Sequence, residues 1–217
     1  MTDRTSNILD AAAELIQTVG FNAFSFRDLA GRVGISSASV HYHFPTKQDL
    51  CLAIIARYRD GVRASMAAVD AEGLGPLGRL RRYARMFQET IESGNRMCLC
   101  GMLASDIGAL EQPARDALRD VFGDHEAWLT GVLESGRASG ELEFPGSATT
   151  TARMLVASLE GALLVARTFD DRERFAALAE GLLSWIDPRA RGRDGGPRRR
   201  ASAGAGKRTP PKRERSR

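Results

Sequence analysis

The chain has 217 residues, of which 43% are hydrophobic and 27% are charged, and its formal net charge is +4. This length is enough for one large domain, or for a small domain joined to a larger one. No stretch approaches the roughly eighteen uninterrupted apolar residues of a membrane span, and the N-terminus is not a basic-then-apolar leader. We therefore expect no membrane span and no secretion signal, and we predict a cytoplasmic protein.

The positive charge is concentrated at the C-terminus. Residues 187–217 contain twelve Arg or Lys and three Asp or Glu, a net charge of +9, which leaves −5 on residues 1–186. The same segment is rich in Gly, Pro and Ser and has almost no large apolar residue, so burial cannot offset the entropy of ordering it. We predict that 187–217 is a basic disordered tail, either a solubilising terminus or a nonspecific attraction for nucleic-acid phosphates.

The first predicted element is an amphipathic helix from Asn7 to Val19, which Gly20 ends. Its apolar residues recur at helical spacing and form one stripe that would face a core. They are Ile8, Leu9, Ala12, Leu15, Ile16 and Val19.

Residues 25–50 indicate a short helix, a tight turn and a second short helix. Ser25 can cap the first helix, whose third position is Asp28, so that each supplies a hydrogen-bond partner to the other's backbone. Gly34 stands where a tight turn favours a residue that tolerates positive φ.

The second short helix is predicted over Ser37–His43, with Ser36 as its cap and Val40 on its buried side. Its exposed side carries small and polar groups. An α-helix fits the major groove of B-DNA, where each base pair offers a distinct set of donors and acceptors, and short side chains let it sit deep. The segment therefore predicts a helix-turn-helix that reads duplex DNA.

The N-terminal part of this second helix is expected to approach base edges, while flanking groups contact phosphates. Thr46 can cap the next helix, and the peptide N–H groups at its start, with the charge of Lys47, favour a phosphate. His41 and His43 have no third ligand at zinc-site spacing, so we predict no metal site. The residues predicted to bind DNA are Ser25, Arg27, Ser36, Ser37, Ala38, Ser39, His41, Tyr42, His43 and Lys47.

Asn7–Gly20 and Ile35–Leu50 together resemble the TetR family of bacterial one-component transcriptional regulators. The family signature after the turn is an aromatic-His-Phe run followed by Ser/Thr-Lys, and residues 43–47 (His-Phe-Pro-Thr-Lys) and 49–50 (Asp-Leu) match it. Ala38 replaces the usual Gly and His41 the usual Tyr. Later, only the run Leu159–Arg167 adds to the resemblance. The resemblance to the TetR family implies an all-α fold. It places a three-helix DNA-binding domain in residues 1–50 and a larger helical ligand-binding and dimerisation domain in 51–186.

The remainder of the chain is expected to be helical as well, with no strand alternation and no repeat. One segment, Met97–Leu110, is apolar nearly all round and rich in Met, Cys and Gly, so it must be surrounded by protein. The expected helices are Lys47–Val69, Leu77–Ser93, Met97–Leu110, Pro113 to about Gly140, Ala148–Thr168 and Asp171–Ile186.

A single short recognition helix contacts few base edges, so such readers usually pair about a two-fold axis over a palindrome. The last two helices carry more apolar surface than a monomer easily covers, and the resemblance implies a four-helix dimer interface there. Some of these positions are equally suited to the core of one subunit. The predicted interface residues are Leu155, Leu159, Gly161, Ala162, Val165, Phe175, Leu178, Leu182 and Trp185.

The resemblance also places a ligand pocket among the middle helices, where large, adaptable side chains suit an apolar effector. A ligand that fits better when the long helix from Lys47 is tilted would change the separation of two recognition helices. The predicted pocket residues are Phe87, Met97, Cys98, Met102, Trp128 and Leu129.

Three cysteines, Cys51, Cys98 and Cys100, form no disulfide-framework spacing, which fits a reducing compartment. Cys98 or Cys100 permits an alternative in which an electrophile or oxidant modifies a thiol and replaces the bound ligand as the trigger. Residues two apart on a helix point to different sides, so we expect at most one of the two to face the pocket.

The sequence has no nucleophile with a base at motif spacing, no phosphate-cradling glycine loop and no metal cluster, so we predict neither an enzyme nor a cofactor. The favoured interpretation is a homodimeric repressor, released from a palindromic double-stranded DNA operator by a small apolar ligand. A further alternative is a nonspecific architectural DNA binder that depends on the basic tail.

Overall fold

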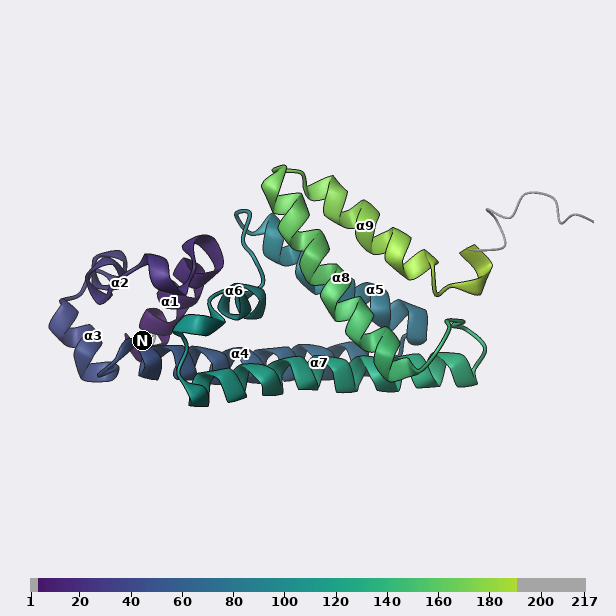
Figure 1. The fold of residues 1–217 in the computed structure, drawn as a ribbon, viewed down its shortest axis with the longest axis horizontal. Helices are drawn as coiled ribbons and strands as arrows, with labels where there is room; N and C mark the ends of the chain where they lie inside the picture. The colour runs from purple at the N-terminus through teal and green to yellow at the C-terminus, as the bar shows by residue number, and fades with distance from the viewer. Residues whose placement is uncertain (1–3, 191–217) are drawn as a thin grey trace, which may run out of the picture.

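The structure, a computed structural model, describes residues 4–190, and every regular element in this range is helical (Figure 1). The prediction of an all-α fold is confirmed. The predicted helices differ from the observed ones mainly by a few residues at their ends. The α-helices are α1 Arg4–Val19, α2 Phe26–Val33, α3 Ser37–His43, α4 Lys47–Ala71, α5 Pro76–Glu92, α6 Leu99–Ser105, α7 Gln112–Ala138, α8 Ala148–Thr168 and α9 Arg172–Ser184.

Helices α1, α2 and α3 form a small head at one end of the molecule, and the remaining helices form the body (Figure 1). The head surrounds a core in which Ile8, Leu29 and Val40 are fully buried. Gly34 ends α2 with φ 76°, and its N–H donates to Ala30 O at 2.9 Å. A left-handed residue at this position turns the chain within two residues, so α3 crosses α2 closely.

α4 joins the head to the body as one unbroken helix of 25 residues. Its first turns bury Leu50 and Ile54, and its later turns bury Val62 and Met66. In the body α4 packs along α7, and the two long helices lie side by side in Figure 1. The boundary that we placed between residues 50 and 51 therefore falls inside a helix, because the linker between the two units is itself regular structure.

The apolar segment 97–110 is not the single helix that we predicted. Met97 and Cys98 precede α6, which covers only Leu99–Ser105, and a short 3-10 turn follows at Ile107–Ala109. Cys98 has φ −55° and ψ 133°, so it is extended rather than helical. The segment is enclosed by protein as expected, since Met97 through Cys100 and Leu103 are all buried.

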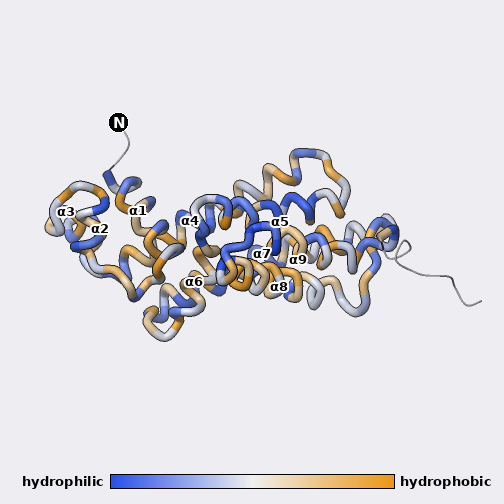
Figure 2. The backbone as a smooth tube through the Cα atoms, turned by 90° about the horizontal axis from the view of Figure 1, so that it is seen from above, coloured by the Kyte–Doolittle hydropathy of each residue, from blue (hydrophilic) through white to orange (hydrophobic). Residues whose placement is uncertain are grey.

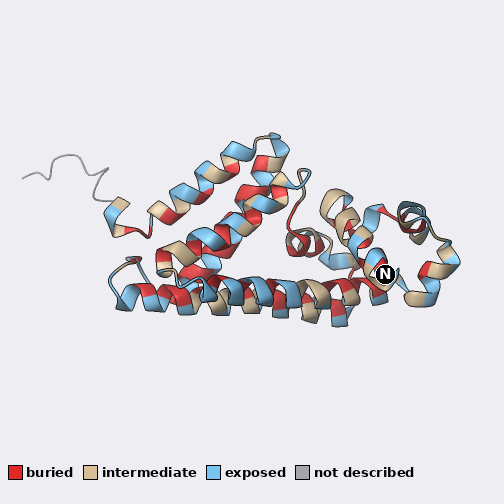
Figure 3. Ribbon diagram, turned by 180° about the vertical axis from the view of Figure 1, so that it is seen from behind, coloured by how far each residue is buried: buried red, intermediate tan, exposed pale blue. Residues whose placement is uncertain are grey.

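The helices of the body differ in polarity. Figure 2 shows hydrophilic residues along α5 and hydrophobic ones along α8. Buried positions follow the inner faces of the helices in Figure 3, whereas α8 and α9 also leave large apolar side chains exposed. No helix within residues 4–190 combines the length and the apolar character needed to cross a membrane.

The predicted tail lies outside the described residues from position 191 onward. Its first residues, 187–190, are described and continue the body. The N–H of Glu143 donates to Ile186 O at 2.9 Å, and the Asp187 carboxylate accepts the N–H of Arg189 at 2.9 Å.

Candidate DNA-binding surface and ligand cavity

α3 presents a short polar face outward on a fixed base. The Ser36 hydroxyl accepts the N–H of Ser39 at 3.1 Å and so caps the helix, while Val40 is fully buried beneath it. On the opposite side Ala38 is exposed and the Tyr42 side chain is 86% exposed. An exposed aromatic ring on a seven-residue helix has no folding role, which makes Tyr42 available to a partner.

The two histidines of α3 have different surroundings. His41 is exposed, packs edge-on against Phe26 at 4.7 Å between ring centroids, and has its Nδ1 3.3 Å from Pro45 O. His43 is half-buried, and its Nδ1 lies 3.1 Å from the Thr5 hydroxyl of α1. His41 therefore stays at the outer surface, whereas His43 ties the end of α3 to α1.

The start of α2 places Arg27 in solvent beside α3. Ser25, the cap residue, uses its hydroxyl and its N–H to donate to the Asp28 carboxylate, both at 2.7 Å. These hydrogen bonds from Ser25 lower the pKa of Asp28. Ser25 is therefore committed to the capping box, while the Arg27 guanidinium is exposed toward the predicted DNA surface.

Lys47 corrects the sequence-based expectation. We expected its ammonium to add charge to a phosphate site at the N-terminus of α4, but it donates instead to the main-chain oxygens of Phe21 and Phe24. It also lies over both rings, 4.7 Å and 4.2 Å from their centroids. Burial lowers the pKa of Lys47. The side chain thus stabilises the corner between α1 and α2.

A cavity of about 430 Å³ opens where the head meets the body. Its walls come from the end of α1, the middle of α4, the end of α5, the chain before α6, and α7. Its lining contains both polar and apolar side chains. The cavity is therefore less apolar than the ligand pocket that we predicted from the sequence. The lining residues are Gln17, Tyr58, Gly61, Val62, Ser65, Met86, Phe87, Glu89, Thr90, Ser93, Arg96, Cys98 and His125.

Only Phe87 and Cys98 of the six predicted pocket residues line this cavity. Met97 and Leu129 are buried in the core. The Trp128 indole N–H donates to the Asp70 carboxylate at 3.0 Å, and its ring stacks on Tyr83 at 5.7 Å between centroids.

Met102 lies against Gly20 and beside the Arg167 guanidinium. Met97, Met102, Trp128 and Leu129 were thus predicted from their size and apolar character, and core residues share both properties.

A buried polar pair that sequence reasoning missed lies beside the cavity, and one of its members, His125, lines it. The Tyr83 hydroxyl lies 2.8 Å from His125 Nδ1, and both side chains are almost fully buried. Burial lowers the pKa of His125 to about 4, so the imidazole is neutral at pH 7. A neutral ring has one nitrogen that donates and one that accepts, and His125 reaches the cavity wall. No local motif marks this pair, because its members are 42 residues apart.

Several hydrogen bonds fix the end of α1 to the body near this cavity. The Met97 N–H donates to Gln17 O at 3.1 Å, and Arg96 pairs with Glu14 at 2.7 Å. On the other side, Asp106 accepts the N–H of Phe21 at 2.7 Å. A change in the chain around Met97 or Asp106 is therefore transmitted to the head by direct contacts.

The predicted interface residues on α8 and α9 divide into two groups. Leu155, Leu159 and Phe175 are buried within the chain, which fits the alternative that some of these positions belong to the core of one subunit. Val165 and Leu178 are exposed by 42% and 47%.

Gly161 and Trp185 are also exposed, Leu182 is half-buried and Ala162 is nearly buried. Two further exposed apolar residues, Met154 and Leu164, were missed. A groove of about 540 Å³ runs between the helices and is lined by Ser158, Leu159, Gly161, Ala162, Val165, Ala177, Leu178, Gly181 and Leu182.

A helix-turn-helix head continuous with a larger helical body defines a class of DNA-binding regulators. Comparison with known proteins identifies the family. A family profile described as "Bacterial regulatory proteins, tetR family" matches residues 8–54, and one described as "Tetracyclin repressor-like, C-terminal domain" matches residues 76–182. The chain belongs to the TetR family, which confirms the resemblance seen in the sequence.

Individual relatives agree with this assignment. The crystal structure of a TetR-family transcriptional regulator from Agrobacterium tumefaciens is 35% identical, with a TM-score of 0.81, and the match covers 85% of this chain and 97% of that one. The transcriptional regulator AcuR of Cereibacter sphaeroides is 26% identical over 74% of this chain and 75% of its own. The HTH-type transcriptional repressor KstR2 of Rhodococcus jostii is 28% identical over 63% of this chain and 67% of its own. The protein is thus a DNA-binding transcriptional regulator and not an enzyme.

Proposed function

We propose that the protein is a homodimeric repressor that binds a palindromic operator through α3 and leaves it when a small molecule occupies the cavity between head and body. The observation that carries this proposal is the outer face of α3. Its small side chains and the exposed Tyr42 stand on a helix fixed by Val40 below and by the Ser36 cap at its start. Such a face has the size and the polarity that the major groove accepts.

Dimerisation is supported by the groove between α8 and α9. Val165 and Leu178 are exposed apolar residues, and Gly161 and Gly181 have no side chain to keep a second helix away. An exposed apolar groove of this kind is stabilised when a second copy covers it about a two-fold axis. Two copies of α3 would then face two half-sites one helical turn apart.

Release by a small molecule is supported by the position of the cavity. Tyr58 on α4 and Gln17 on α1 both line it, so a bound molecule contacts the two helices that carry the head. Arg96 and His125 in its wall favour an effector that carries a polar group, rather than the purely apolar one predicted from sequence. We propose repression as the mode of action. The relative KstR2 is named as a transcriptional repressor.

Selection of duplexes from a random pool tests the proposal. The full-length protein should enrich one palindromic sequence, and Ser39→Ala and Tyr42→Ala should each change the bases enriched near the centre of a half-site. Arg27→Ala is the matched control, because loss of a phosphate contact weakens binding to all sequences equally. Enrichment of no palindrome, or an unchanged preference in both α3 variants, would contradict the proposal.

A further inference from the structure

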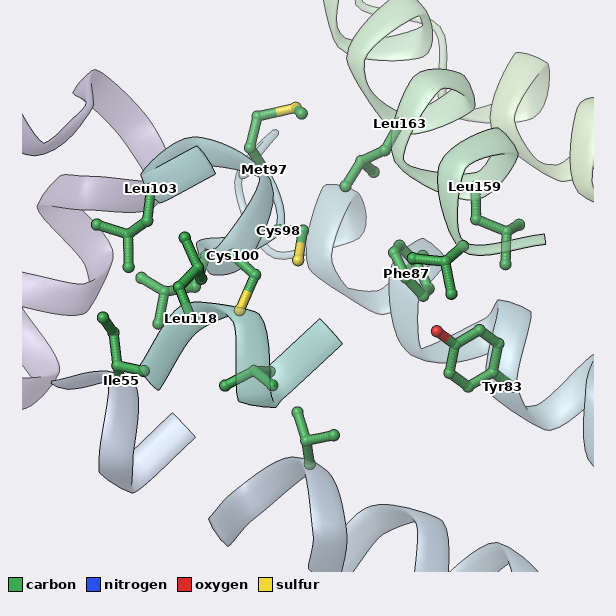
Figure 4. Packing of buried hydrophobic residues seen from close by; sticks show 14 of the residues in the cluster. Ile55, Tyr83, Phe87, Met97, Cys98, Cys100, Leu103, Leu118, Leu159 and Leu163 are labelled. Carbon is green, nitrogen blue, oxygen red and sulfur yellow. The ribbon is translucent and has the colours of Figure 1, made fainter. Parts of the chain in front are cut away.

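One wall of the cavity carries a thiol in an unusual setting. Cys98 lines the cavity, and its sulfur lies 3.5 Å from the Tyr58 hydroxyl. Residues two apart on a helix point to different sides, but Cys98 precedes α6 instead of lying within it. The Cys98 and Cys100 thiols can therefore be direct neighbours, as they are here. Figure 4 shows both cysteines within the same buried cluster.

A carboxyl group reaches the same place from the other side of the body. Glu160 of α8 extends to the first turn of α6, and its Oε2 is buried without a hydrogen-bond partner in the described structure. It lies directly against Gly101, where an added Cβ would be 2.5 Å from that oxygen. Gly101 therefore leaves the space that Glu160 needs to reach Cys98 and Cys100. An unpaired buried carboxyl oxygen is costly for folding alone, which points to a role in binding or chemistry.

We propose that the cavity takes a small α,β-unsaturated carbonyl compound and that the Cys98 sulfur adds to its β-carbon, so that the adduct acts as the releasing signal. This deepens the proposed function, on which it rests. The cavity volume of about 430 Å³ suits a small organic molecule. The Arg96 guanidinium is a donor in its wall for the carbonyl oxygen of the compound.

The reaction is an addition and requires no oxidant. The sulfur lone pair forms a C–S bond to the β-carbon, and the electron pair of the C=C bond moves onto the α-carbon and carbonyl oxygen. The Cys98 sulfur attacks as the thiolate, and Glu160, whose carboxyl group is protonated at pH 7, gives its proton to the α-carbon. Glu160 then recovers from water the proton that the thiol released when it ionised. The product contains every atom of the thiol and of the unsaturated compound.

The surroundings of the three thiols in the chain separate Cys98 from the others. Hydrogen bonds from Cys100, Glu160 and Tyr58 lower the pKa of Cys98 to about 6, and burial raises the pKa of Glu160 to about 10. Burial raises the pKa of Cys51 to about 12, and the pKa of Cys100 is also raised. Since the thiolate is the nucleophile, Cys98 is the residue prepared to react.

An adduct at this position would act on the head directly. Tyr58 belongs to α4, and the residue before Cys98 holds α1 through the hydrogen bond from Met97 N–H to Gln17 O. We expect atoms added to the Cys98 sulfur to displace Tyr58 or the chain around Met97, because both adjoin the site. Either displacement changes the position of α1 and α4, and with them α3.

Mass spectrometry with methyl vinyl ketone tests the proposal, with 2-butanone as the matched compound that lacks the C=C bond. We expect one adduct on Cys98 of the full-length folded protein, formed at least tenfold faster than on Cys51 or Cys100 at pH 7. Methyl vinyl ketone should release operator DNA, and 2-butanone at the same concentration should not. Equal labelling of the three thiols, or an adduct on Cys98 without DNA release, would overturn the proposal.

Variants separate this proposal from the proposed function. Cys98→Ser should bind operator DNA as the unmodified protein does but ignore methyl vinyl ketone, and Cys100→Ser should still form the adduct. Glu160→Gln, which keeps the side-chain size, should slow the adduct about tenfold or more. The adduct is detected by mass, and DNA binding is measured before any reagent is added. A protein that forms the adduct but never binds DNA would therefore contradict the proposed function and not the reactivity of Cys98. The comparison of labelling rates within the unchanged protein stands even where a variant does not fold.

Discussion

The outer face of α3 and the wall of the cavity differ in how far apart in the chain their residues are. α3 is set by residues within ten positions of one another, since Ser36 caps it, Val40 buries its inner side and Phe44 ends it. The cavity requires residues from α1, α4, α5 and α7, such as Gln17 and His125. The proposed DNA-binding surface is therefore set mainly by neighbouring residues of the chain, whereas the cavity exists only when the whole body has folded.

The largest expected effect concerns the α8–α9 groove, where we propose that a second copy of the chain packs. The double variant Val165→Glu, Leu178→Glu places charges where a second copy would pack, and burial of unpaired charge is strongly unfavourable. We expect monomers and a loss of operator affinity of about a hundredfold or more, since two linked half-sites bind far more tightly than two separate ones. Sedimentation velocity and fluorescence anisotropy measure the two effects.

Ile107→Glu is the control for this change, because Ile107 is also an exposed apolar residue, 42% accessible, but lies outside the groove. It should remain dimeric. A double variant that stays dimeric and keeps its operator affinity would place the dimer contact elsewhere.

The cavity wall should make the stability of the protein depend on pH. The pKa of His125 is lowered by burial from its ordinary 6.5 to about 4, with Asp124 opposing the shift. The stabilisation by neutral His125 is complete above about pH 6.5 and is lost as the pH falls toward 4, because the unfolded chain takes up the proton first. We expect this group to lower the unfolding free energy by about 3 kcal/mol at pH 4 relative to pH 7.

Urea unfolding of the unchanged protein and of His125→Gln at both pH values isolates this contribution. The variant should be less stable at pH 7, because Tyr83 loses its partner, but should show the weaker dependence on pH. Parallel pH profiles for the two proteins would mean that His125 is not buried in its neutral form.

Two basic residues of the head should give opposite results. Lys47→Met keeps the contact with the Phe21 and Phe24 rings but removes the donor to their two carbonyl oxygens, so we expect a loss of about 2 kcal/mol in unfolding free energy. Arg27→Met, at an exposed position, should leave stability unchanged and weaken DNA binding at low salt. If Lys47→Met were as stable as the unchanged protein and lost DNA affinity instead, the original interpretation of Lys47 would be restored.

The smallest expected effect tests whether α3 is locally determined. Ser36→Ala removes the acceptor for the Ser39 N–H, a change that costs about 1 kcal/mol at a helix cap. Amide hydrogens of α3 should exchange about fivefold faster, while those of α7 stay unchanged. Ser65→Ala on an exposed turn of α4 is the control. Equal acceleration in α3 and α7 would show that the head and the body unfold together.

The sequence predicted most of the fold because most helix ends depend on neighbouring residues. Both capping boxes, at Ser25 and Thr46, follow from residues three positions apart, and Gly34 ends α2 as its spacing indicated. The break between Cys98 and α6 was missed, since an apolar run has no internal signal for where a helix begins. That break arises where the chain hydrogen-bonds to α1 through Met97.

The surface of α3 was predicted better than Lys47 or the cavity wall, because only the former depends on neighbouring residues of the chain. The surface of α3 could be read from seven residues, but the direction of the Lys47 side chain depends on Phe21 and Phe24, which approach it only after α1 and α2 have packed. The polar members of the cavity wall, such as Tyr58 and His125, carry no local motif that marks them as neighbours of a cavity. Their burial is a consequence of contacts between helices far apart in the chain.

The continuity of α4 has a mechanical consequence. A helix of 25 residues is about 37 Å long at a rise of about 1.5 Å per residue. A rotation of about five degrees at its body end thus carries its other end through about 3 Å, comparable to the rise of about 3.4 Å between successive base pairs. The residues of α4 that line the cavity lie near the middle of the helix, so they would move only about half as far as the end at the head. In the proposed release, a modest displacement at the cavity would thus become a misfit of about one base-pair step at the DNA.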